Sequence, residues 1–245
     1  MPIKAQLIIA QDLSVGNWIR EGLASWGSVP FTVGVCIPSD FESYVLIRHT
    51  GEQDGPGHLG STTLTVLLSM LSGFTSTPAH CFHALWEGYG PLNRGASSIF
   101  VPRKRSKIPW ITKHKLFRYL NMWIPMKMHR HRDLSNRELS LNTLPEGILE
   151  FARFQLPNRN YLLMQGSIME ALHIGFQHGS YFSLQSPNLI WPEDKSWILV
   201  SEIDFSATLV GGSQELIQKI LLNKELTAEV FQRTDTPTDL ALSDY

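Results

Sequence analysis

The run SWILVSEIDFSATLVGGS, residues 196–213, constrains the fold most, because it has the pattern of a buried strand and yet carries two carboxylates. Alternate residues of a strand lie on opposite faces, so Glu202 and Asp204 share one side, roughly 6.5–7 Å apart at the backbone. Such a pair can hold a divalent cation or act as an acid and a base. The ordinary alternative is a strand emerging at the sheet edge, with its carboxylates solvated or paired with Lys or Arg.

Segments of strand and helix type follow one another without strict alternation along the chain. Strand patterns occur at 43–49, 80–88, 97–102, 160–166, 196–204, 207–211 and 227–233. Helical patterns occur at 14–27, 61–71, about 113–124, 167–176 and 213–222. This irregular mixture predicts an α+β fold with a mixed, mainly antiparallel sheet and several packed helices. We expect one domain over 1–234 and a disordered tail over 235–245.

Length, cysteine usage and hydropathy limit the class of protein. A chain of 245 residues with 43% hydrophobic residues can bury a proper core. Cys36 and Cys81 lie in apolar surroundings, which is typical of buried thiols in a reducing compartment. The N-terminus lacks a signal-peptide pattern, and no apolar run reaches the ~20 residues of a membrane helix. We therefore expect a cytoplasmic protein without a transmembrane segment.

The near-neutral net charge of −1 hides a strong segregation of charge. Ten Lys or Arg and no Asp or Glu lie between Arg103 and Arg132, which leaves 11 basic and 22 acidic residues elsewhere. We read 103–145 as a basic insertion. Its interleaved aromatic residues suit nucleic acid, an anionic surface or an acidic partner. Alternatively, its cations neutralise the acidic remainder of the same protein.

Two segments resemble ligand sites but lack a necessary part. The loop GPGHLGST, residues 55–62, stands between a strand and a helix, as a phosphate-binding loop does, but Ser61 occupies the position of the required lysine. His129, His131 and Asp133 alternate within a segment whose lysine and arginines oppose metal binding. We predict no metal site and no cofactor.

Aromatic and acidic side chains gather in two turns at predicted strand ends, LWEGYG and IWPEDKSW, where ligands often bind. Together with the carboxylate pair, they give the candidate binding residues Trp86, Glu87, Tyr89, Trp191, Asp194, Trp197, Glu202 and Asp204. Packing in the core or at the sheet edge is the competing interpretation. No pattern of the Ser-His-Asp or Cys-His kind occurs, so no catalytic residue is predicted.

Two blocks of the chain resemble a family of bacterial proteins of unknown function that is frequent in actinobacteria. The first is TSTPAHCFHALWEGYG, residues 75–90. The second is PNRNYLLMQG, residues 157–166, continued by SPNLIWPEDKSWILVSEIDFSATLVGGSQELI, residues 186–217. The resemblance implies a bacterial cytoplasmic protein and leaves its function open. The segment 103–145 has no counterpart there, in keeping with an insertion.

These features favour a non-enzymatic domain that binds a protein partner or a ligand, of the immunity or regulatory type. Two alternatives stay open. One is a divalent-metal-dependent hydrolase in which Glu202 and Asp204 bind a cation that activates water. The other is nucleic-acid binding through the basic segment 103–132.

Overall fold

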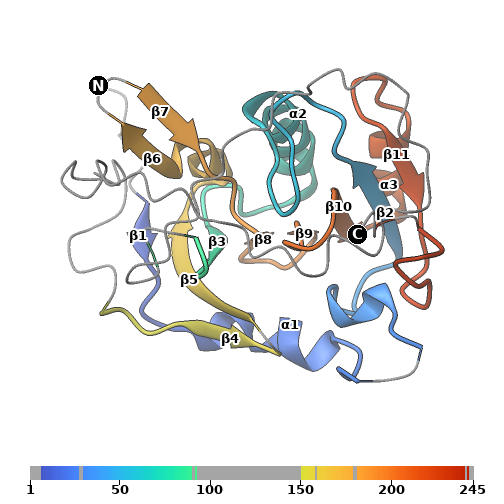
Figure 1. The fold of residues 1–245 in the computed structure, drawn as a ribbon, viewed down its shortest axis with the longest axis horizontal. Helices are drawn as coiled ribbons and strands as arrows, with labels where there is room; N and C mark the ends of the chain where they lie inside the picture. Colours follow the sequence, from blue (N-terminus) through green and yellow to red (C-terminus); the bar gives the residue numbers. More distant parts are fainter. Residues whose placement is uncertain are drawn as a thin grey trace, which may run out of the picture.

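Nine strands form one sheet, which is the frame of the structure (Figure 1). The computed structural model describes residues 7–27, 30–89, 92, 150–157, 159–178, 181–240 and 242. The strand order is β1–β5–β3–β8–β9–β10–β2–β11, with β4 also paired to β5, and each pairing is antiparallel. The strands are β1 (Ile8–Ile9), β2 (Ser43–Arg48), β3 (Cys81–Trp86), β4 (Phe154–Leu156), β5 (Arg159–Gly166), β8 (Leu189–Pro192), β9 (Ile198–Val200), β10 (Ala207–Gly212) and β11 (Ala228–Val230).

Helices and one small ribbon complete the described part of the chain. The ribbon pairs β6 with β7. The bounds of the ribbon strands and helices are β6 (Gly175–His178), β7 (Tyr181–Leu184), α1 (Asn17–Gly22), α2 (Ser61–Leu71), α3 (Gln214–Leu221) and the 3-10 helices η1 (Ser14–Gly16), η2 (Val33–Val35), η3 (Ser72–Phe74) and η5 (Ile168–His173). The predicted α+β class with a mainly antiparallel sheet is confirmed. Within the described ranges, no helix has the length and apolar character needed to cross a membrane.

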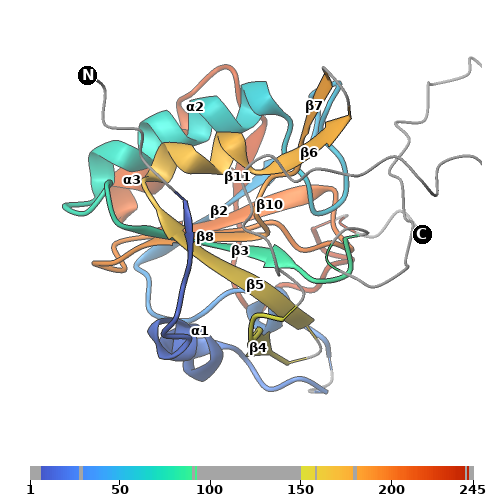
Figure 2. The ribbon, with the colours of Figure 1, turned by 90° about the vertical axis from the view of Figure 1, so that its left-hand side faces the viewer.

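The sheet is covered on both faces by different kinds of structure (Figure 2). On one face, α2 and α3 pack against each other and against the sheet. Leu64, Leu67, Leu68 and Leu71 are fully buried there, at the spacing that puts one face of a helix against a core. On the other face lie α1, the loop around η2 and the residues after 230. Every residue of β8, β9 and β10 is consequently buried.

The predicted elements differ from the observed ones chiefly in length. The helix over 61–71 is confirmed as α2, and Ser213 caps α3 by accepting a hydrogen bond from Leu216 N at 3.3 Å. The helical pattern over 14–27 ends as α1 at Gly22, and the one over 167–176 forms only η5. The predicted strand at 97–102, the helix at about 113–124 and the insertion 103–145 lie outside the described residues.

The sequence predicts a disordered tail over 235–245. The described residues of this segment, 235–240 and 242, instead pack against the sheet. Leu240 and Leu242 are buried with the core of the α1 face. Asp235 O accepts a hydrogen bond from Val33 N at 2.9 Å. The physical reason is that the two leucines remove apolar surface from water at the open face of the sheet.

A half-buried histidine, His58, and a fully buried one, His83, are held in the neutral form. Ser186 N donates to His58 Nδ1 at 3.2 Å, which requires an unprotonated nitrogen. His83 is fully buried in β3, with Nε2 3.1 Å from Ser167 O. Burial lowers the pKa of each imidazole to about 4 from the usual 6.5. Folding therefore disfavours protonation of both rings.

Stability is expected to fall in mild acid for this reason. Below about pH 6.5 the unfolded chain takes up protons at His58 and His83, whereas the folded protein takes them up only near pH 4. The free energy of unfolding should be fully retained above pH 6.5 and decrease by about 1.4 kcal/mol per pH unit for each histidine as the pH falls toward 4. Urea unfolding of wild type between about pH 7 and about pH 5 measures this slope.

His58→Gln should lessen the slope, and His80→Gln, at an exposed position, serves as the matched control. An unchanged slope in His58→Gln would show that the proton uptake occurs elsewhere.

Candidate functional site

The two carboxylates of the opening run lie in the turn between β9 and β10 and not within a strand, because β9 ends at Val200. Both contact Arg159, the first residue of β5. Arg159 Nη2 lies 3.1 Å from Glu202 Oε1 and 2.7 Å from Asp204 Oδ2. Of the ordinary alternative, the pairing with an arginine is confirmed, but the carboxylates lie between two central strands and not in a strand at the sheet edge.

The two carboxylates differ in their environment. The side chain of Glu202 is 13% exposed and that of Asp204 is 68% exposed. Burial raises the pKa of Glu202 from its usual value, although the adjacent Arg159 guanidinium opposes the shift. Arg159, Glu202 and Asp204 together carry one positive and two negative formal charges, so the three side chains have a net charge of −1.

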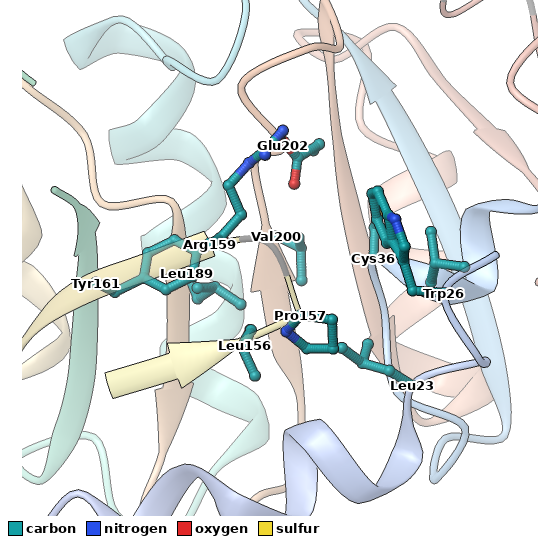
Figure 3. A pocket seen from close by; sticks show the side chains of 11 residues that line it. Leu23, Trp26, Cys36, Leu156, Pro157, Arg159, Tyr161, Leu189, Val200 and Glu202 are labelled. Atoms are coloured by element: carbon teal, nitrogen blue, oxygen red, sulfur yellow. Dashed lines mark hydrogen bonds and ion pairs between the residues drawn. The ribbon is translucent and has the colours of Figure 1, made fainter. Parts of the chain in front are cut away.

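A hollow opens beside this charged group (Figure 3). Arg159 and Glu202 form its polar wall, and the other lining residues are Leu23, Trp26, Val35, Cys36, Leu156, Pro157, Tyr161, Leu189 and Val200. Its volume is about 20 Å³, close to what one water molecule needs. Drug-sized ligands and cofactors occupy pockets of roughly 300–1,000 Å³. The hollow can therefore admit the tip of a side chain and no larger group.

One residue that lines the hollow, Trp26, forms an exposed aromatic pair with Phe31. Trp26 and Phe31 are 46% and 37% exposed, and their ring centroids lie 5.2 Å apart in an edge-to-face arrangement. We give the name Trp26 face to six residues: Trp26, Pro157, Arg159 and Glu202, which line the hollow, Phe31, which contacts Trp26, and Asp204, which contacts Arg159. It combines exposed aromatic area, an apolar recess and a negatively charged group.

The loop that carries Trp26 is fastened by Arg233. Its guanidinium donates to Gly22 O at 2.8 Å, to Gly34 O at 3.2 Å and to Ile37 O at 3.0 Å. Gly34 N in turn donates to Arg233 O at 2.9 Å. Hydrogen bonds from a charged donor are stronger than neutral ones, so these contacts hold both ends of the segment that carries Trp26.

Sequence reasoning missed Arg159 and misplaced Trp26. Trp26 falls within the helical pattern predicted over 14–27, but α1 ends four residues before it, at Gly22. Arg159 stands alone as a cation beside the strand pattern of 160–166, and that was the available signal. Its partners come from a turn 45 residues away, which no local pattern indicates.

Trp191 and Trp197 are not part of any binding surface, which corrects their assignment as candidates. Both side chains are fully buried, one toward each face of the sheet. Trp191 stacks on Phe82 with 5.4 Å between ring centroids. Their large apolar area makes the core the favourable place for both rings.

Asp194 joins two turns within the protein. Its carboxylate accepts hydrogen bonds from Ser76 N at 2.7 Å, from Thr75 Oγ1 at 2.9 Å and from Ser196 Oγ at 2.8 Å. Burial alone would raise the pKa of Asp194, but the hydrogen bonds from Ser196 and Ser76 outweigh it and hold the pKa well below its usual range. These contacts explain Asp194 as a structural residue.

The turn after β3 holds the remaining candidates, Trp86, Glu87 and Tyr89. The rings of Trp86 and Tyr89 meet edge to face at 5.5 Å. Glu87 accepts from Asn160 Nδ2 at 2.7 Å. Tyr89 donates to Gly57 O at 3.2 Å, and burial raises its pKa to about 12. These internal contacts do not join the three residues to the Trp26 face.

The glycine-rich loop 55–62 uses its backbone donors internally. Gly60 N donates to Asp54 Oδ1 at 2.7 Å, and Leu59 N donates to Ser186 Oγ at 2.9 Å. A phosphate cradle needs such N–H groups directed at the ligand. Their occupation is consistent with the interpretation of a plain loop before a helix.

A hydrogen-bonded relay of hydroxyls and imidazole lies beneath this loop. Ser201 Oγ is 2.7 Å from Thr208 Oγ1, which is 2.8 Å from His49 Nε2, and His49 Nδ1 is 2.7 Å from Gly55 O. Burial lowers the pKa of His49. Ser201 and Thr208 are fully buried, so these hydrogen bonds connect the loop to the sheet.

No group of three or more His, Cys, Asp and Glu side chains with metal-site geometry occurs among the residues that the structure describes. The segment with His129, His131 and Asp133 lies outside them. In comparisons with known proteins, no family model, curated protein or solved structure matches this chain.

Removal of Arg159 is expected to destabilise the protein through Glu202. Arg159→Met leaves a largely buried carboxylate without its cation, so the free energy of unfolding at neutral pH should fall by about 1–3 kcal/mol. Asp204→Asn removes the exposed partner and should change it by less than about 1 kcal/mol. Urea unfolding of both variants measures the difference, and equal effects would contradict the assigned asymmetry.

Proposed function

We propose that this chain is a non-enzymatic binding protein that docks a protein partner on the Trp26 face. The observation that carries the proposal is the exposed Trp26–Phe31 pair beside a recess with a charged wall. Tryptophan and arginine are enriched among the residues that contribute most to protein–protein affinity. A fixed loop also reduces the entropy lost when a partner binds.

The size of the hollow favours a protein partner over a small molecule. A recess of about 20 Å³ cannot enclose a ligand, but it can receive the tip of one side chain from an opposing surface. The remaining contact area then comes from the exposed rings beside it. Exposed aromatic side chains beside a small apolar recess are typical of the centre of a protein interface.

The chemistry of the polar groups supports a role without catalysis. Burial raises the pKa of the Cys36 thiol far above its usual value, so this sulfur is protonated and a poor nucleophile. Cys36 and Cys81 are both free and buried, in keeping with a cytoplasmic protein. An immunity or regulatory protein, which acts by occupying its partner, requires no reactive group.

The two alternative functions have less support. Arg159 already supplies the positive charge between Glu202 and Asp204 that a divalent cation would supply. Nucleic-acid binding was assigned to 103–132, which lies outside the described residues. The Trp26 face is negatively charged and would repel phosphate.

Affinity capture from a lysate of the source organism tests the proposal. Wild type and Trp26→Ala serve as baits, and retained proteins are quantified by mass spectrometry. We expect at least one protein to be retained by wild type and reduced by about tenfold or more with Trp26→Ala, the loss typical of a central aromatic contact.

Leu222→Ala is the matched control, because Leu222 is a large apolar side chain that is 81% exposed and lies beside α3, on the opposite face of the sheet. It should retain the same proteins as wild type. A set of proteins that is identical for all three baits would overturn the docking site.

A further inference from the structure

The charge of the Trp26 face indicates which chemical group it binds. Two carboxylates and one guanidinium meet in it, which leaves one negative charge in excess. Asp204, whose side chain is 68% exposed, presents part of this negative charge to solvent. A cationic group is therefore attracted to this face at long range and at contact.

The shape of the face suits a cation on an aliphatic stem. The hollow has apolar walls below and the carboxylate of Glu202 directed toward it from above (Figure 3). Asp204, with 68% of its side chain exposed, adds an accessible acceptor. The exposed ring of Trp26 offers a face that attracts cations and stacks on planar groups.

Arginine fits this combination better than lysine. Its planar guanidinium can stack on an indole ring and donate two parallel hydrogen bonds to one carboxylate. Lysine carries a compact charge that cannot do both. The guanidinium of Arg20, a cation of the same chain, is already hydrogen-bonded to Gln155 O at 2.7 Å.

We infer that the Trp26 face recognises an arginine side chain of a basic segment in its protein partner. The inference rests on the proposed function and specifies the partner's chemistry. The arginine stem lies along Trp26 and Pro157, and its guanidinium donates to Asp204 beside the existing contact with Arg159. The bound state then has two guanidinium groups and two carboxylates, with charges that balance.

Titration with a small probe tests this inference directly. The probe is the blocked tripeptide acetyl-Gly-Arg-Gly-amide, and its neutral, nearly isosteric control carries citrulline in place of arginine. The indole N–H resonance of Trp26, assigned by its loss in Trp26→Phe, reports binding. We expect a saturable shift with the arginine probe and at least tenfold weaker binding of the citrulline probe. Binding should also weaken several-fold as salt rises from about 0.05 M to about 0.5 M.

Asp204→Asn should weaken binding of the arginine probe. Asp12→Asn, which changes an exposed carboxylate hydrogen-bonded to Ser14, should not. No saturable shift, or equal binding of the arginine and citrulline probes, overturns the inference.

Charge reversal in the capture experiment separates this inference from the proposed function. Loss of the partner with both Trp26→Ala and Asp204→Lys supports both. Loss with Trp26→Ala alone overturns the arginine assignment and leaves the docking site intact. Retention with both variants overturns the docking site itself.

Discussion

Burial of the central strands on both faces is the constraint from which the rest of the structure follows. Every residue of β8, β9 and β10 is buried, so neither face of the sheet can remain open to water. Helices α2 and α3 cover one face with leucine and isoleucine side chains. The second face is covered mostly by irregular chain, and an irregular layer must be fixed by individual contacts.

Those contacts determine where a recess can form. Arg233 fixes the loop of Trp26, and Asn188 fixes the ends of the central strands by accepting from Trp86 N at 2.9 Å and donating to Ser201 O at 3.0 Å. The turn with Glu202 follows directly after Ser201. The hollow therefore lies where a fixed loop meets a fixed turn, which gives it a defined shape without regular structure around it.

The sequence predicts an element well when the contacts that stabilise it lie close together along the chain. It predicts an element poorly when those contacts come from distant segments. Helix α2 was predicted over its full length because its leucines repeat at helical spacing, and α3 because Ser213 marks its start. Strands β1 and β4 have two and three residues, too few for a pattern. The side chains of Trp191 and Trp197 sit beside charged residues in sequence, but the apolar groups around them come from distant segments.

The pairing of Arg233 with Gly34 bridges 199 residues of sequence. Closing so long a loop is entropically unfavourable until most of the sheet exists to bring its ends together. During synthesis on the ribosome, the segment that carries Trp26 gains its hydrogen bonds to Arg233 only after residue 233 has been translated. The N-terminal layer of the second sheet face is thus completed by one of the last parts of the chain to be made.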